Sequence, residues 1–122
     1  MAARTLYIVD TDRSVRDGLA RLAASAGFAA RPCECAETFI GEARAGDAAC
    51  ALLDLSDAGL RKAEVRARLS VVATWLPMIA LSARDDSQTR ATAREVGARA
   101  FFRKPVDAAA LLDSIAWVTR SA

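Results

Sequence analysis

Five short apolar segments alternate with five amphipathic segments along the 122 residues of this chain. The apolar segments are rich in β-branched, aromatic and small apolar residues, a composition that favours strands. We expect strands near residues 5–9, 28–33, 51–53, 77–82 and 99–102. Apolar residues recur at helical spacing in the segments between them, and we expect helices near residues 13–26, 36–45, 59–69, 85–96 and 107–119. This alternation predicts an α/β fold, with helices covering both faces of one parallel sheet.

The third apolar segment is the centre of the predicted sheet. Residues 51–53 are uncharged and apolar, and the run stops abruptly at Asp54. Such a run is typical of a strand that is covered on both faces. Asp54 would then lie at the carboxyl end of a buried strand, where open α/β sheets bind their ligands. The plain alternative is that Asp54 only caps the segment that follows.

Composition limits the possible chemistry. The chain has no histidine, which excludes Ser-His and Cys-His catalysis, the usual general base and most zinc sites. Its three cysteines, Cys33, Cys35 and Cys50, lack metal-like spacing, and we expect buried, reduced thiols. A net charge of +2 is too small to indicate nucleic-acid binding by itself. Strand-like sequence begins at Thr5 and the apolar runs are too short to span a bilayer, so the expected location is the cytoplasm.

Polar residues follow four of the predicted strands. Asp10 ends the first strand, Asp54 the third, Ser82 the fourth and Lys104 the fifth. In a doubly wound sheet these ends open on the same edge, so the four side chains should converge there. We find no internal repeat, linker or low-complexity segment, and we expect a single domain over residues 1–122.

These residues and their spacing carry a resemblance to a known family. The chain resembles the receiver domains of bacterial two-component response regulators over essentially its whole length. The matching pieces are residues 7–10, Val15-Arg16 with Leu19, residues 52–54, residues 77–83, Gly97-Ala98 and residues 101–105. The resemblance implies a three-layer (βα)5 sandwich of the CheY type with strand order 2-1-3-4-5. It also implies a signalling switch and not an enzyme.

The resemblance assigns a role to each strand-end residue. Asp54 would be the phosphoacceptor and would receive the phosphoryl group from a phosphohistidine of a partner kinase or phosphotransfer protein. Asp10, Asp54 and the backbone carbonyl of Ser56 would hold Mg²⁺, a hard cation that prefers oxygen ligands. Ser82 would hydrogen-bond the phosphoryl group, and Lys104 would pair with its oxygens. These groups would position the phosphoryl group and neutralise its charge.

The resemblance also indicates how a signal would leave the domain. Phe101 stands where the family has an aromatic that moves inward on activation, although an ordinary core aromatic is an equal alternative. Several arginines lie between residues 84 and 103, and their plain interpretation is a solvated face with i,i+4 pairs such as Asp86–Arg90. They would also suit an acidic partner or a homodimer through the face formed by residues 84–120. A downstream protein or output domain would read the state of the switch. DNA would be reached only through an output domain that this sequence does not contain.

Three departures from the family pattern affect these expectations. Thr11 replaces a second metal-binding acid, so Mg²⁺ should bind weakly; Asp12 could substitute for it or simply cap the next helix. Asp57 and Ala58 replace Met-Pro, and Asp57 could bind metal, repel a phosphoryl group or cap a helix. Lys62 stands near an expected glycine, which indicates a loop of different backbone shape.

These departures keep a second hypothesis open, a pseudo-receiver that binds protein partners constitutively and independently of phosphate. A small flavodoxin-like enzyme or cofactor binder is more remote, because no glycine-rich phosphate loop follows the first strand.

Overall fold

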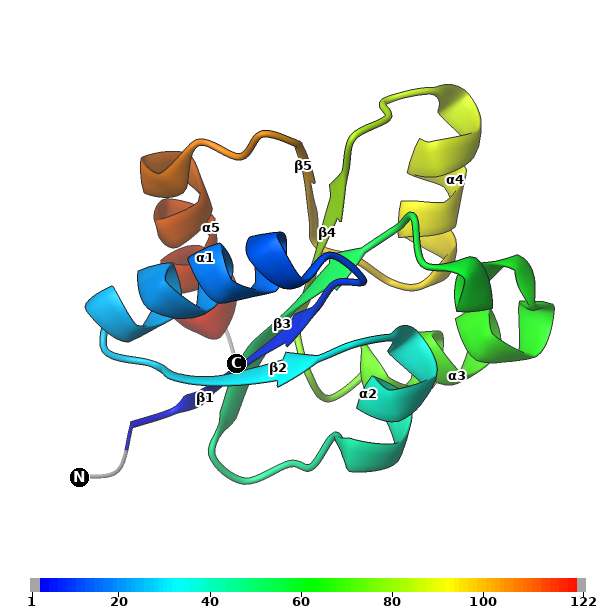
Figure 1. Ribbon diagram of the computed structural model, residues 1–122. Helices are drawn as coiled ribbons and strands as arrows, with labels where there is room; N and C mark the ends of the chain where they lie inside the picture. Colours follow the sequence, from blue (N-terminus) through cyan, green and yellow to red (C-terminus); the bar gives the residue numbers. More distant parts are fainter. Residues whose placement is uncertain (1–2, 121–122) are drawn as a thin grey trace.

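The computed structural model describes residues 3–120 and has three layers, with a central sheet between two layers of helices (Figure 1). The strands are β1 (Thr5–Val9), β2 (Ala29–Cys33), β3 (Ala48–Asp54), β4 (Met78–Ser82) and β5 (Ala100–Arg103). The helices are α1 (Arg13–Ser25), α2 (Ala36–Glu42), the 3-10 helix η1 (Ala58–Arg61), α3 (Ala63–Val72), α4 (Ser87–Glu95) and α5 (Ala108–Arg120). All strand pairs are parallel, in the order β2-β1-β3-β4-β5. The predicted fold class and strand order are therefore confirmed.

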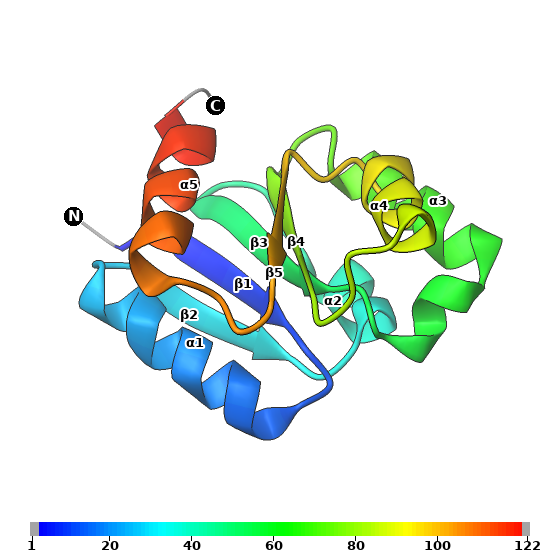
Figure 2. The ribbon, with the colours of Figure 1, turned by 90° about the horizontal axis from the view of Figure 1, so that it is seen from above.

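The helices divide between the two faces of the sheet. Helices α1 and α5 cover one face, and α2, α3 and α4 lie on the other, as the two views in Figures 1 and 2 both show. Each helical layer closes a separate apolar core against the sheet. Strand β2 is an edge strand, which explains how it accommodates Pro32. Across residues 3–120, no helix combines the length and the apolar character needed to cross a membrane.

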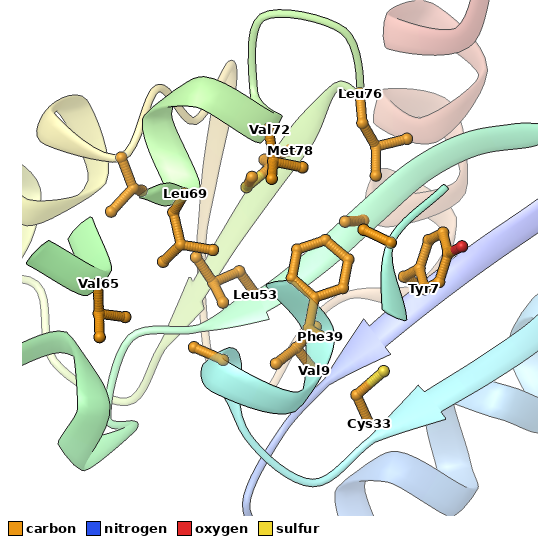
Figure 3. Packing of buried hydrophobic residues seen from close by; sticks show 14 of the residues in the cluster. Tyr7, Val9, Cys33, Phe39, Leu53, Val65, Leu69, Val72, Leu76 and Met78 are labelled. Atoms are coloured by element: carbon orange, nitrogen blue, oxygen red, sulfur yellow. The ribbon is translucent and has the colours of Figure 1, made fainter. Parts of the chain in front are cut away.

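Strand β3 lies in the middle of the sheet and is buried from Ala49 to Asp54. Above it, the Phe39 ring points into the core between the sheet and α3, where Leu53 and Leu69 also lie (Figure 3). Phe39 meets the Tyr7 ring edge-on, with ring centroids 5.3 Å apart. The Tyr7 hydroxyl accepts the backbone N–H of Arg44 at 3.2 Å, so this aromatic pair also fixes the chain just after α2. The site at the end of β3 therefore stands on a densely packed core.

The helix predicted over residues 59–69 is wrong at its start. The chain instead forms η1 and then α3, because Lys62 between them is extended, with φ −86° and ψ 123°. Arg66 stabilises this break by donating from its guanidinium to the carbonyl of Leu60 at 2.6 Å. The extended conformation agrees with the different loop shape that Lys62 indicated.

The chain around α2 also differs from the prediction. Helix α2 ends at Glu42, because Ala43 is extended with ψ 131°. The Arg44 guanidinium binds the carbonyls of Gly41 and Ala43 at this end. Cys35 occupies the N-cap position of α2, where it is half-buried and its Sγ lies 3.2 Å from Thr38 Oγ1. Only Cys33 and Cys50 are the buried thiols that we expected.

Two glycines illustrate how helices end in this fold. Gly27 follows α1 with φ +89°, and Gly97 follows α4 with φ +84°. Both lie in the left-handed region, which glycine tolerates best. At Gly97 space is also short, because a Cβ atom there would lie 2.8 Å from the Cβ of Ala73. Gly97 therefore allows the turns after α3 and α4 to touch.

Candidate functional site

Four of the predicted site residues lie at the carboxyl edge of the sheet. Asp10 directly follows β1, Asp54 ends β3, Ser82 ends β4 and Lys104 directly follows β5. Asp10, Asp54 and Ser82 are buried, and Lys104 is half-buried. The parallel strands bring these residues together because their carboxyl ends meet at one edge.

Lys104 joins the two buried carboxylates. Its Nζ lies 2.7 Å from Asp10 Oδ2 and 3.4 Å from Asp54 Oδ1. Burial alone would lower the pKa of Lys104, but the hydrogen bond with Asp10 and the charge of Asp54 outweigh it, so this pKa is raised. The lysine therefore stays charged at neutral pH and compensates the two acids.

Ser56 orients the carboxylate of Asp54 from the loop that follows β3. The Ser56 hydroxyl donates to Asp54 Oδ2 at 2.7 Å, and the Ser56 backbone N–H donates to Asp54 Oδ1 at 3.1 Å. With Lys104, each oxygen of Asp54 has at least one partner. Hydrogen bonds to an ionised carboxylate are stronger than neutral ones, so this side chain is firmly placed. Sequence reasoning assigned only the backbone carbonyl of Ser56, and it missed the hydroxyl.

Asp10 is fixed by the turn between β1 and α1. Its Oδ1 accepts the backbone N–H of Asp12 at 2.9 Å, and its backbone carbonyl accepts Arg16 Nη1 at 2.8 Å. Asp12 is exposed and caps α1, with its side chain accepting the N–H groups of Ser14 and Val15. The structure therefore supports the capping role of Asp12, and Thr11 beside it is also exposed.

Ser82 lies at the same edge but is bonded to its own loop. Its Oγ accepts the backbone N–H of Arg84 at 3.0 Å, and its carbonyl accepts the backbone N–H of Lys104 at 2.8 Å. A hydroxyl that accepts one hydrogen bond still has its own proton to donate. Ser82 therefore has the chemistry needed to donate to an anion at this edge.

Asp57 is a helix cap in this structure. It is buried, its Oδ2 accepts the N–H of Ala36 at 2.6 Å, and its Oδ1 accepts the N–H of Gly59 at 2.8 Å. One carboxylate thus serves the starts of both α2 and η1. A second link joins the same two segments, because Lys62 Nζ lies 3.5 Å from Glu37 Oε1. Of the three roles considered for Asp57, the hydrogen bonds support capping.

The donor set at the sheet edge fits a magnesium ion. Asp10 and Asp54 provide two carboxylates, and the Ser56 carbonyl is a third oxygen close by in sequence. Mg²⁺ is commonly held by one or two carboxylates and keeps several waters. Within residues 3–120, no group of three or more acidic, histidine or cysteine side chains is placed to hold a metal. Two carboxylates already bound to Lys104 therefore form a weaker site than three would.

Phe101 lies outside this cluster, in β5, where Arg90 of α4 covers its ring. It is half-buried, and the Arg90 guanidinium carbon lies 5.1 Å from its ring centroid. The expected pair between Asp86 and Arg90 is wrong, because Arg90 pairs with Asp85. Asp86 instead caps α4 through the N–H of Thr89 at 2.8 Å. Phe101 is thus a surface-facing aromatic beneath an arginine and not a fully buried core residue.

Comparison with known proteins decides the family. The profile of the response regulator receiver domain matches residues 6–116. The chain belongs to the response regulator receiver family. The transcriptional regulatory protein TdiR of Thauera aromatica is 34% identical over 113 residues, which span 93% of this receiver domain and 50% of TdiR. The transcriptional regulatory protein FixJ of Azorhizobium caulinodans is 28% identical over 110 residues, or 90% of the receiver and 52% of FixJ.

Solved structures agree with this assignment. The response regulator StyR aligns with a TM-score of 0.82 and 34% identity, covering 98% of this receiver and 60% of StyR. A response regulator receiver protein from Burkholderia phymatum aligns with a TM-score of 0.77 and 30% identity, covering 96% of the receiver and 95% of that chain. The receiver spans about half the length of the curated relatives that it matches. It is therefore similar to one part of those transcriptional regulators.

Proposed function

We propose that this receiver domain accepts a phosphoryl group on Asp54 and thereby changes which proteins it binds. The observation that carries the proposal is the placement of the Asp54 carboxylate. It is buried at the sheet edge, oriented by two hydrogen bonds from Ser56, and paired with Lys104. A fixed carboxylate beside a fixed cation suits attack on a phosphoryl group, because phosphoryl transfer depends mainly on positioning and charge neutralisation.

The donor in this proposal is a phosphohistidine on a partner kinase or phosphotransfer protein. An oxygen of Asp54 attacks phosphorus, the bond between phosphorus and the imidazole nitrogen breaks, and an aspartyl phosphate forms. The electron pair of that bond stays on the imidazole. Lys104 neutralises negative charge on the phosphoryl oxygens, and the Ser82 hydroxyl donates a hydrogen bond to one of them. The donor must come from another protein or a small acyl phosphate, because this chain contains no histidine.

Asp10, Asp54 and the Ser56 carbonyl are the residues that would hold Mg²⁺. The ion would supply additional positive charge for the phosphoryl oxygens. We expect weak binding, because exposed Thr11 contributes no carboxylate and Lys104 already occupies one side of the acidic pair. Millimolar Mg²⁺ should still fill the site.

The proposed output is a change on the face formed by α4, β5 and α5. The Ser82 hydroxyl bonds the loop that leads into α4, so a phosphoryl group that recruits Ser82 would disturb the Arg84 N–H. Phe101 and Arg90 lie on the same face and would respond next. We propose that a downstream protein, an output domain or a second copy binds this face, within residues 84–120.

The test is an amide NMR titration of the receiver with Mg²⁺ and then with beryllofluoride, a phosphoryl mimic. Shifts at Ser56, at residues 82–84 and at residues 101–104, absent in Asp54→Asn, are the expected result. A spectrum that stays unchanged at millimolar Mg²⁺ and saturating beryllofluoride would overturn the proposal. That outcome would favour the pseudo-receiver hypothesis, in which the unmodified domain binds its partners.

A further inference from the structure

Arg16 is a cation in contact with Asp10 that has no part in the proposed reaction. It lies in the first turn of α1 and is half-buried. Its Nη1 donates to the backbone carbonyl of Asp10 at 2.8 Å, so the guanidinium is held against the residue that carries one of the two carboxylates. The Asp10 side chain itself accepts the backbone N–H of Asp12 and Lys104 Nζ. The position of the Arg16 charge is therefore set by the same turn that positions Asp10.

Among the side chains that contact Asp10 or Asp54, the charges of Lys104 and Arg16 balance those of the two carboxylates. Asp10 and Asp54 bring two negative charges, and Lys104 and Arg16 bring two positive ones. Thr11 adds no charge at the position where the family pattern has a second acid. Charge interactions in a partly buried site are weakly screened by salt.

We propose that Arg16 is a second cation of the phosphorylation site, one that favours an anionic phosphoryl group and opposes a divalent metal. This inference rests on the proposed function of Asp54. The charge of Arg16 attracts an anion bound at the carboxyl edge of the sheet and repels a cation bound between Asp10 and Asp54. Thr11 and Arg16 thus both weaken Mg²⁺ binding. The site therefore depends more on Lys104 and Arg16 than on Mg²⁺ to neutralise a bound phosphoryl group.

The inference predicts effects of opposite sign for two ligands. Replacing Arg16 with glutamine should tighten Mg²⁺ binding by roughly three- to tenfold, because one repulsive charge is removed. The same replacement should weaken beryllofluoride binding, at saturating Mg²⁺, by roughly three- to tenfold. A purely structural role would weaken both ligands together, since loss of the Asp10 turn would disturb the whole site.

The experiment compares four purified proteins: the unsubstituted receiver, Arg16→Gln, Arg16→Lys and Arg13→Gln. Mg²⁺ affinity is measured by amide NMR titration, and beryllofluoride affinity by fluorine NMR at saturating Mg²⁺. Arg16→Lys keeps the charge and should stay close to the unsubstituted protein for both ligands. Arg13→Gln is the matched control, since Arg13 lies in the same turn but is exposed and pairs with Asp17 at 3.9 Å. It should change neither affinity.

The two affinities in the four proteins distinguish the possible roles of Arg16. Tighter Mg²⁺ binding together with weaker beryllofluoride binding in Arg16→Gln, with little change of either affinity in the two other variants, supports the inference. Weakening of both ligands in Arg16→Gln, or equal behaviour of Arg16→Lys and Arg16→Gln, overturns it while leaving the Asp54 function intact. If no variant binds beryllofluoride, the proposed function and the inference both fail.

Discussion

The carboxylate of Asp57 accepts the backbone N–H of Ala36 across 2.6 Å, although 21 residues separate them in the chain. This hydrogen bond ties the loop after Asp54 to the start of α2. The same carboxylate accepts the N–H of Gly59, so both of its oxygens are used. The loop beside the proposed phosphoacceptor is thus anchored by a residue that does not take part in the chemistry.

Replacing Asp57 with alanine should destabilise the protein strongly. It would leave the buried N–H of Ala36 and the half-buried N–H of Gly59 without their acceptor, and remove one cap from each of two helices. We expect a loss of about 3 kcal/mol in the free energy of unfolding, measured by urea denaturation. Asp57→Asn, which keeps one acceptor oxygen, should lose about half as much. The control is Asp107→Ala, because Asp107 is an exposed cap of α5 whose loss should cost only about 1 kcal/mol. Equal losses of unfolding free energy in Asp57→Ala and Asp107→Ala would contradict the role of Asp57 as the cap of two helices.

Removing the Ser56 hydroxyl should make Asp54 more reactive. That hydroxyl donates to Asp54 Oδ2 at 2.7 Å and withdraws electron density from the carboxylate that we propose to be the nucleophile. Ser56→Ala should therefore raise the rate of phosphorylation by acetyl phosphate by up to roughly tenfold, which corresponds to about 1.4 kcal/mol. Ser56→Thr keeps the hydroxyl and should stay near the original rate. A slower Ser56→Ala variant would show instead that the hydrogen bond is needed to aim the carboxylate.

Stability should fall at alkaline pH, because the buried thiols ionise more readily once the chain unfolds. Burial raises the pKa of the Cys50 thiol from 9.0 to about 12. Between these values the unfolded chain has lost the proton and the folded chain keeps it, so the free energy of unfolding decreases as pH rises. The slope from this thiol is at most about 1.4 kcal/mol per pH unit. The raised pKa of Lys104 acts in the same direction at the upper end of this range.

The measurement is urea denaturation at several pH values between 8 and 11, a range chosen around the ordinary thiol pKa. Cys50→Ala should show a shallower decline than the unsubstituted protein. Cys35→Ala is the control, since Cys35 is half-buried and should leave the slope unchanged. Identical slopes in all three proteins would show that Cys50 does not control the alkaline transition.

Substitution of Gly97 should cost more than substitution of Gly27. Both glycines have a positive φ, so alanine at either position carries a backbone penalty of about 1 kcal/mol. Only at Gly97 would the new methyl group lie 2.8 Å from Ala73, whereas nothing lies within 4 Å at Gly27. Gly97→Ala should therefore lose at least about 1 kcal/mol more in unfolding free energy than Gly27→Ala. Thermal or urea denaturation of the pair tests this, and equal losses would show that the two turns can move apart.

The fold and the convergence of Asp10, Asp54 and Lys104 were predictable, because both follow from local patterns. Strand and helix periodicity identified the layers, and parallel strands place their carboxyl ends at one edge. The links made by Arg16 and Asp57 were not predictable. Each depends on how far a side chain reaches across a turn or between two segments, and the sequence does not encode that distance locally.

Competition between partners explains the wrong ion pair. Spacing favoured Asp86 as the partner of Arg90, but Asp86 already accepts the N–H of Thr89 as the cap of α4. Arg90 therefore binds Asp85, one residue earlier. The break at Lys62 has a similar origin, because Asp57 starts a short helix that ends before α3 begins. In both places a helix cap determined the local structure, and the helical spacing of the residues did not predict it.

The bond between Lys104 and Asp10 joins residues 94 positions apart. During synthesis, a ribosome must therefore have released nearly all of the domain before the acidic pair gains its lysine. A nascent chain that stops before β5 would lack the lysine that pairs with both carboxylates and could not hold a phosphoryl group in the proposed way. If Asp54 accepts a phosphoryl group as proposed, the domain gains that capacity only after β5 and Lys104 have been synthesised.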